Sequence, residues 1–280
     1  MFWKSTYNEL IKIAAKPRSY IGIGAITLII GIILFAMKMD GMSFISFVTQ
    51  PFEQSLSFEG NILNGNLIAF IILQMLIIHV PLLIALVTGD LVSGEGAMGT
   101  IRLLMTKPIS RTKILFSKYL AGCAYTFVIL LWMLFMALVV GKWIFGTGDL
   151  MVLNSDGLIV LQEHDLAWRF LSGFSVAYLS LVMIATLSLT FSCFSENSIG
   201  PIVSTMAVII VFTIIGALDL PVLAKIQPYL FTTHMMAWRN FFEDPLPTEK
   251  IMTSIVILLV HIVALLSIAV YKFNRKDILS

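Results

Sequence analysis

The segment Asp90–Lys118, DLVSGEGAMGTIRLLMTKPISRTKILFSK, is the longest polar and basic interruption on one predicted side of an otherwise apolar chain. Uncharged windows flank it, Gly60–Gly89 before it and Tyr119–Gly141 after it. Each window is long enough for an α-helix to cross a hydrocarbon core, which takes about 20 residues. The segment is therefore predicted to connect two membrane-spanning helices, and the rest of the chain is interpreted outward from it.

The composition places the chain among integral membrane proteins. Of its 280 residues 59% are hydrophobic and 12% are charged, whereas a soluble domain carries about 25% charged residues. Cys123 and Cys193 lie in apolar runs and are interpreted as buried thiols rather than as a disulfide, redox or metal pair. The first apolar run, from Tyr20, is too long for a cleavable signal peptide and has no small-residue cleavage site after it.

Six windows without Asp, Glu, Lys or Arg predict six transmembrane helices in one domain, residues 1–280. Helix is the expected state because lipid cannot satisfy the free backbone groups of a single strand. The fold class is therefore predicted as an all-α integral membrane protein. The spans are expected near 19–37, 66–89, 114–141, 171–194, 199–218 and 251–271.

Basic residues predict the orientation. Twelve of the 18 Lys and Arg residues lie in the two termini and the Asp90–Lys118 segment. Because cytoplasmic loops carry an excess of Lys and Arg, both termini and residues 90–112 should be cytoplasmic. Residues 142–169 and 219–250 should then be extracytoplasmic. The third helix is expected to start early, with Ser110 as a fair N-cap.

Residues 1–18 predict an interfacial helix ahead of the first span. An apolar stripe at helical spacing opposes a polar face, and Pro17 should end the helix. The aromatic residues at its start favour the membrane interface over the alternative, a disordered basic tail. The stripe is Trp3, Tyr7, Leu10 and Ala14, and the polar face is Lys4, Asn8 and Lys12.

Histidines raise the question of ligand sites. In the second span Pro81 should kink the helix, and His79 beside it could bind a ligand, although a hydrogen-bonded helix contact is favoured. His164 lies between two acidic residues, but neighbouring side chains of this kind cannot all reach one ion. A role for His261 is left open.

The segment 219–250 is aromatic-rich but broken by Pro228, which predicts a re-entrant helical segment before the last span. His234 with the two methionines after it could hold a soft metal, although ordinary packing by methionine is preferred. Trp238 and Arg239 are interpreted as an anchor at the membrane interface.

Motifs for catalysis or ATP binding are missing. The sequence has no GxxxxGK[ST], HExxH or GxSxG pattern, so no catalytic, cofactor or metal site is predicted. No charged residue lies in the interior of a predicted span, which weakens the case for a secondary transporter. An energy source must then lie on another protein, or the chain is not a pump.

The order of residues in the Asp90–Lys118 segment resembles the cytoplasmic signature of type-2 permeases of ATP-binding cassette (ABC) exporters. An acidic residue at the end of the second span is followed by a glutamate, Gly-Thr, two leucines, a Pro-Ile-Ser-Arg turn and a lysine. One departure is Gly96, where the family often has a basic residue. The matching residues are Asp90, Glu95, Gly99, Thr100, Leu103, Leu104, Pro108, Ile109, Ser110, Arg111 and Lys118.

This resemblance implies a coupling helix, roughly Leu91–Thr106, that docks on a separate ATP-binding subunit. The ATPase activity and its ATP-Mg would reside on two copies of that subunit, and this chain would be a transport subunit rather than an enzyme. Glu95 and Arg102 are expected to pair at the rim of the docking surface. The residues expected to carry docking are Asp90, Glu95, Gly99, Thr100, Arg102, Leu104, Pro108 and Arg111.

The resemblance also implies further partners and a location. A second permease chain, identical or related, would complete the export pathway in a bacterial or archaeal plasma membrane, in contact with lipid and without nucleic acid. A lipidic, amphipathic or peptide-like substrate is expected because the predicted pathway lacks charges. The alternatives are a non-transporting mechanotransmitter that works with an ATPase, an ion-coupled secondary transporter, or an ordinary basic loop that only sets the topology.

Overall fold

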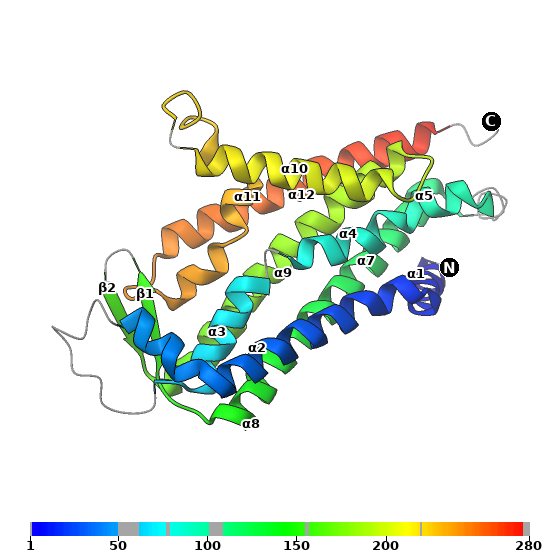
Figure 1. Ribbon diagram of the computed structural model, residues 1–280. Coiled ribbons are helices and arrows are strands. Elements are labelled where there is room, and N and C mark those ends of the chain that lie inside the picture. Colours follow the sequence, from blue (N-terminus) through cyan, green and yellow to red (C-terminus); the bar gives the residue numbers. More distant parts are fainter. Residues whose placement is uncertain are drawn as a thin grey trace.

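Long helices lying side by side form the body of the chain in the computed structural model (Figure 1). The structure describes residues 2–49, 62–76, 79–100, 109–154, 157–218 and 220–276. The described ends of the chain lie at the same end of the helix bundle, and a short β-hairpin lies at the opposite end (Figure 1). Below, these are called the terminal end and the hairpin end.

Five helical segments in the described residues are long and apolar enough to cross a membrane, and a bent pair makes up to six. The chain is therefore a predominantly helical, multi-pass membrane protein, as the composition predicts. The long segments are α2 (Pro17–Thr49), α7 (Arg111–Leu134) with its continuation to Phe145, α9 (Glu163–Phe194), α10 (Gly200–Ala217) and α12 (Thr248–Arg275).

The first helix after Pro17 is longer than the sequence indicates. Pro17 begins α2 rather than merely ending the preceding helix, because proline fits the first turn of a helix, where the backbone N–H needs no partner. Non-helical backbone angles at Asp40 mark a kink, and helix continues beyond it to Thr49. The prediction that the first span ends near residue 37 is thus wrong for residues 38–49, and residues 50–61 lie outside the described residues.

The bent pair consists of α3 (Gly65–Leu76) and α4 (Val80–Thr88), inclined by 52° to each other. Pro81 lies in the first turn of α4, so the predicted break of this span is confirmed. His79 precedes α4, and its Nδ1 lies 2.8 Å from the carbonyl oxygen of Met75. This contact is the helix hydrogen bond expected from the sequence.

Residues 142–169 are not one loop. Helix α7 continues through the π-helical turn η1 (Phe135–Val140) into α8 (Gly141–Phe145). Strands β1 (Leu150–Asn154) and β2 (Gly157–Leu161) pair antiparallel, with Leu150 opposite Leu161. Helix α9 begins at Glu163, several residues before the predicted span. The hairpin is an addition to the predicted all-α fold, and its alternating apolar residues bury Leu150 and Val152 against the core.

Helix α9 is the central helix of the bundle. In its most apolar window 72% of the residues are buried, against 11% in α10. Helices α4, α7, α10 and α12 all pack on α9, and α10 and α12 expose apolar side chains such as Ile210 and Val260. A membrane accounts for these exposed apolar faces, since lipid tails are as apolar as the side chains.

Residues 220–247 form a series of short turns between α10 and α12. They include η2 (Gln227–Tyr229), α11 (Phe231–His234) and η3 (Ala237–Phe242), so the predicted broken helical segment is present in the described part. Trp238 is only 2% exposed and packs against Phe70 and Phe242. The prediction of Trp238 as an interface anchor is therefore wrong, because η3 turns this side chain into the bundle.

Candidate functional site

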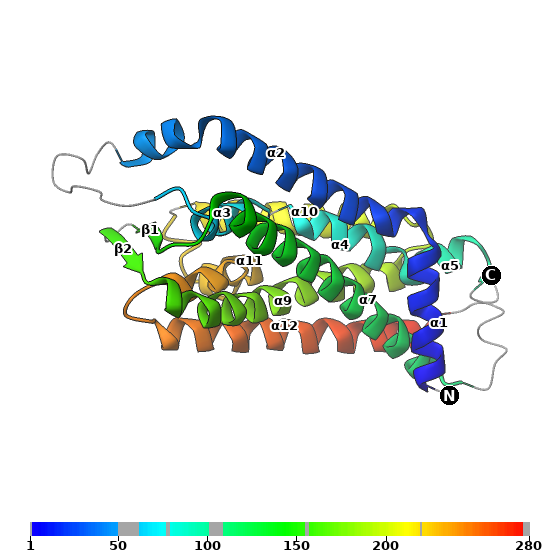
Figure 2. The same cartoon turned by 90° about the horizontal axis from the view of Figure 1, so that it is seen from below.

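The terminal end of the bundle holds a layer in which three elements meet. Helix α1 (Phe2–Ala15) runs across the ends of the long helices rather than along them (Figure 2). It packs on α7 through its Ser5, Glu9 and Ile13 side chains, which are buried. Trp3 and Tyr7 are 75% and 64% exposed, as the prediction of an interfacial helix requires.

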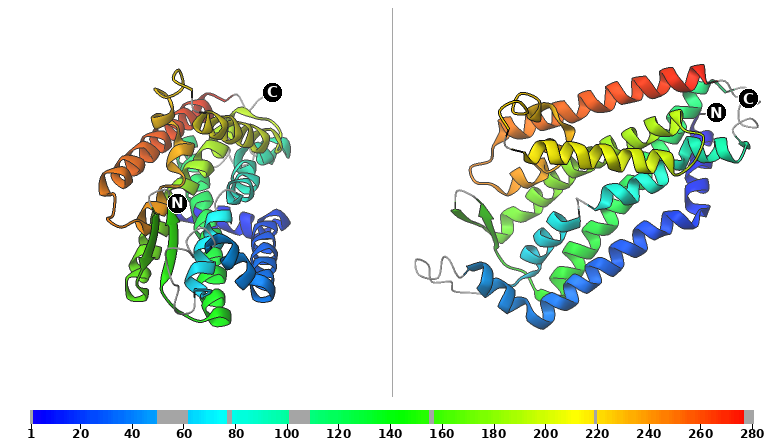
Figure 3. Two further views of the ribbon diagram at one scale, coloured as in Figure 1. Left: turned by 60° about the vertical axis from the view of Figure 1, so that its left-hand side comes forward. Right: turned by 45° about the horizontal axis from the view of Figure 1, so that its top comes forward.

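The short helix α5 (Asp90–Ala97) follows α4 directly and forms the first part of the predicted coupling segment (Figure 3). Its first six residues are buried. Seven charged side chains join α5 to α1, to the start of α2 and to α7, and they are called the ion cluster below. They are Glu9, Lys12, Lys16, Arg18, Asp90, Glu95 and Lys118.

Lys118 lies at the centre of the ion cluster and its side chain is 0% exposed. Its Nζ lies 2.9 Å from Glu9 Oε2 on α1 and 2.8 Å from Glu95 Oε2 on α5. A buried ammonium is stable only when it is paired, because burial removes its hydration. Lys118 therefore ties α1 and α5 to α7, and the loss of Lys118 or of either glutamate reduces the compensation of the charges that stay buried.

Lys12 closes this arrangement from the solvent side. Its Nζ lies 2.7 Å from Glu9 Oε1 and 2.6 Å from Glu95 Oε1. Burial alone would lower the pKa of Lys12, but hydrogen bonds and the charges of the two glutamates outweigh burial and raise it. Burial alone would raise the pKa of Glu95, but the charge of Lys118 and the two lysine hydrogen bonds lower it below its ordinary value. The charged forms of Lys12 and Glu95 are therefore favoured.

Asp90 forms the second half of the ion cluster. Its Oδ2 accepts a hydrogen bond from Lys16 Nζ at 2.6 Å, and its Oδ1 lies 2.8 Å from Arg18 Nη1. Gly94 makes room for this carboxylate, because a Cβ at that position would lie 2.1 Å from Asp90 Oδ1. The start of α5 is thus joined to the junction between α1 and α2.

Further contacts attach α5 to α9. The backbone N–H groups of Val92 and Ser93 donate to Ser192 Oγ at 3.2 and 2.9 Å. The helix ends at Ala97 with Met98 as its C-cap, and Gly99 follows with φ of +70°, a left-handed conformation that suits glycine at a helix C-terminus. Residues 97–100 are exposed, in contrast to the buried start of α5.

Seven of the eight predicted docking residues, all but Arg111, divide into three groups. Asp90 and Glu95 are buried within the ion cluster, so the prediction of Glu95 at an exposed rim is wrong, because two lysines and burial take up its carboxylate. Gly99 and Thr100 are exposed. Arg102, Leu104 and Pro108 lie outside the described residues.

Arg111 makes its contacts within the chain. Ser110 is the residue before α7, as expected, although its side chain makes no capping hydrogen bond in the structure. Arg111 Nη1 donates to the carbonyl oxygens of Asn274 and Lys276 at 3.0 and 2.9 Å. Because carbonyl groups at the end of α12 attract cations, Arg111 holds the start of α7 against the end of the last helix.

Four members of the ion cluster were not predicted as site residues: Glu9, Lys12, Lys16 and Arg18. Lys118 is the lysine of the signature, but its burial was not foreseen. Glu9 could have indicated this cluster, because it is a single acidic residue in a basic terminal segment. A carboxylate in that position is expected to pair with a basic residue.

Two of the histidines form hydrogen bonds within the chain, and both cysteines are free. Both ring nitrogens of His234 are engaged, with Ser254 Oγ at 2.9 Å and the Pro228 carbonyl oxygen at 2.8 Å. His261 Nδ1 lies 2.8 Å from the carbonyl oxygen of Ile257. Cys193 is buried and Cys123 partly buried, and both are free thiols. Among the described residues, no three His, Cys, Asp or Glu residues form a group suited to a metal ion.

Comparison with known proteins places the chain in a family. A family model described as "Protein of unknown function (DUF2705)" matches residues 25–279. The chain belongs to the DUF2705 family. The match contains α5 and α7 with Asp90, Glu95 and Lys118, whereas α1 precedes it. Within the ion cluster, the carboxylates of α5 and the buried lysine are thus part of the family match, and the partners from α1 are not.

One relative of this DUF2705 chain is the "Uncharacterized protein YhcI" of Bacillus subtilis (strain 168). The two are 26% identical over 200 residues, which covers 69% of this chain and 63% of the relative. The match thus spans less than two thirds of the relative's length.

Proposed function

We propose that this chain is the membrane subunit of an ABC exporter, forming the export pathway and receiving force from a separate ATP-binding subunit. The single observation that supports the proposal is the buried Lys118, which joins α1, α5 and α7 through paired carboxylates. The ordered resemblance of residues 90–118 to type-2 permeases gives that observation its functional meaning, and the absence of an ATP-binding motif in the sequence is consistent with an ATPase on another chain.

In this proposal the exposed and buried parts of the coupling segment have different tasks. Met98 is 62% exposed and lies with Gly99 and Thr100 beyond the buried part of α5. These residues, with the predicted docking residues that follow them, contact the partner. Asp90 and Glu95 transmit the force, because they connect α5 to its neighbours inside the chain.

Force applied to α5 would reach the membrane through α7. This helix contains Lys118 near its start and continues as a candidate span to Phe145. Charged pairs at 2.6 to 2.9 Å make α1, α5 and the start of α7 one packed unit, so these elements move together. Such rigid-body motion of packed helices is a common form of gating. A second permease chain, identical or related, would complete the pathway.

The proposal is tested by co-expression with candidate ATP-binding subunits, co-purification, and measurement of ATP hydrolysis in lipid vesicles. The wild-type chain should co-purify with such a subunit and stimulate its hydrolysis. Met98→Asp should reduce co-purification, because it places a charge in the docking contact. Glu95→Gln should retain co-purification and reduce stimulation, because it weakens the link to Lys118 and Lys12.

Glu196→Gln is the matched control, since Glu196 is exposed at the same end of the molecule in the turn between α9 and α10. It should behave like the wild type. Failure of every ATP-binding subunit to associate, or normal stimulation by Glu95→Gln, would contradict the proposal. Transport by vesicles that contain this chain and no ATPase would favour the ion-coupled alternative instead.

A further inference from the structure

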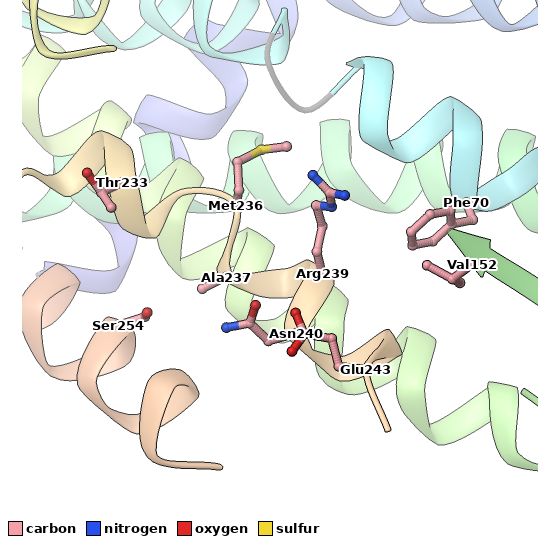
Figure 4. A pocket seen from close by; sticks show the side chains of 9 residues that line it. All are labelled: Phe70, Val152, Thr233, Met236, Ala237, Arg239, Asn240, Glu243 and Ser254. Carbon is pink, nitrogen blue, oxygen red and sulfur yellow. The ribbon is translucent and has the colours of Figure 1, made fainter. Parts of the chain in front are cut away.

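The hairpin end of the bundle contains a cavity of about 290 Å³, shown in Figure 4. It lies among α3, β1, residues 233–243 and α12, far from the ion cluster at the terminal end (Figure 1). This volume is at the lower end of the range for small-molecule sites, which is about 300–1,000 Å³. Its size suits a ligand as small as an amino acid, a short peptide terminus or a lipid headgroup.

Three polar side chains of the lining have no partner among the residues that the structure describes. Among the described residues, the side chains of Arg239, Asn240 and Glu243 make no hydrogen bond or ion pair. Two other polar residues of the lining are already engaged: Thr233 Oγ1 donates to the Gln227 carbonyl at 3.0 Å, and Ser254 Oγ to the Lys250 carbonyl at 2.8 Å. The cavity therefore offers one cation, one anion and one amide for a ligand.

Arg239 and Glu243 do not form an ion pair with each other. Figure 4 shows Arg239 extending from η3 toward Met236 and Phe70, whereas Asn240 and Glu243 extend in another direction. Both charged residues are partly buried, and partly buried charges without a partner are unfavourable. A ligand that carries only a negative charge would pair with Arg239 but would also meet the Glu243 carboxylate.

The wall of the cavity is held in place by neighbouring contacts. Arg169 Nη1 on α9 donates to the carbonyl oxygens of Phe241 and Glu243 at 2.9 and 3.0 Å. The Phe242 ring packs against Phe70 and Phe170 with centroids 5.0 and 4.9 Å apart. These contacts fix η3 and the residue after it, so the polar groups are positioned before a ligand arrives, which lowers the cost of binding.

From this geometry we propose that the cavity binds a small zwitterion that carries an amine and an anionic group. The anionic group pairs with Arg239, the amine with Glu243, and Asn240 supplies hydrogen bonds to either. Phe70, Val152 and Met236 contact the apolar part of the ligand. This assignment goes beyond the proposed function and holds whether or not an ATPase drives the chain.

The zwitterion could be the headgroup of a membrane lipid or a soluble small molecule, and two binding measurements distinguish these sources. The first uses the full chain in lipid nanodiscs and measures retained phosphatidylethanolamine against phosphatidylglycerol by native mass spectrometry. The second titrates the full chain in detergent with O-phosphoethanolamine or glycylglycine, with inorganic phosphate as the anion-only comparison. Saturable binding that prefers the zwitterion in either measurement supports the proposal, and the measurement that succeeds identifies the source.

Arg239→Gln and Glu243→Gln should each weaken zwitterion binding by about tenfold or more, the size expected for loss of one charged hydrogen bond. Lys225→Gln and Glu249→Gln are matched controls, because both residues are exposed, belong to the same part of the chain and do not line the cavity. They should bind like the wild type.

Three results would overturn the assignment. One is no saturable zwitterion binding by the wild type in either measurement. Another is equal affinity for the zwitterion and the anion-only probe, together with unchanged binding by Glu243→Gln. The last is an equal loss of binding in the control variants.

Arg239→Lys preserves the positive charge at this position. It should therefore recover part of the zwitterion binding that Arg239→Gln loses.

Discussion

Replacement of Lys118 by methionine tests the buried ion cluster directly. The ammonium is fully buried, and it pairs with Glu9 and Glu95 at 2.9 and 2.8 Å. Methionine fills a similar volume but leaves two buried carboxylates with Lys12 as their remaining cation. Removal of one partner from a buried ion pair costs about 3–5 kcal/mol, mostly because the remaining charge loses its compensation. At about 2–4 °C per kcal/mol, the midpoint of thermal unfolding should fall by on the order of 10 °C.

The two free cysteines provide the assay. Cys193 is buried and Cys123 partly buried, so a thiol-reactive fluorophore reports unfolding of the detergent-solubilised chain as the temperature rises. Lys113→Met is the matched control, because Lys113 lies on the same helix and is exposed. The triple variant with Glu9→Gln and Glu95→Gln should recover much of the loss, since it removes the uncompensated carboxylates. Equal unfolding temperatures for the Lys118 and Lys113 variants would refute the reasoning.

Three other predictions follow from the same region. The attachment of α1 should be constant between the ordinary glutamate value of 4.5 and the ordinary lysine value of 10.5. It should weaken below that range as the pH falls through the lowered pKa of Glu95, and above that range as the pH rises through the raised pKa of Lys12. Proteolysis of the N-terminal segment across the pH range measures this, and constant protection at both extremes would contradict it. Gly94→Ala should destabilise the chain by about 1–3 kcal/mol through overpacking, since its Cβ would lie 2.1 Å from a carboxylate oxygen of Asp90. Gly96→Ala is the control and should be tolerated, because no atom lies within 4 Å of a Cβ there. Equal unfolding temperatures for the two variants would contradict the packing of α5. A cysteine at Ser110 should react with an impermeant thiol reagent from the cytoplasmic side, and labelling from the outside would reverse the topology.

The helical architecture could largely be predicted from local sequence because its causes are local. Uncharged windows of sufficient length specify helices in lipid, and Pro81 marks the break in the second span. Helix ends were less predictable. The hydrophobic windows end where the charges begin, but α9 and α12 continue past those charges, since charged side chains at helix ends reach the water while the backbone stays helical.

The site was predictable as a segment but not as a set of contacts. Lys118 could be predicted as the lysine of the signature, but its burial could not. Its hydrogen bond with Glu9 joins residues separated by 109 positions, and no periodicity relates them. The burial of Trp238 and the unpaired groups of the cavity arose in the same way, because each depends on which helix faces meet.

The sequence by itself determined that this chain is a helical membrane protein, and it located the interruption between two spans on which the proposed function depends. Both follow from composition and spacing along the chain, which act through lipid and through local backbone geometry. Only the tertiary structure decided that Glu95 of this interruption pairs with a buried lysine and Asp90 with two basic residues at the junction of α1 and α2. It also decided that an arginine and a glutamate at a cavity on the opposite end have no side-chain partner among the described residues. Charge pairing depends on distances through space, and those are set when the helices pack.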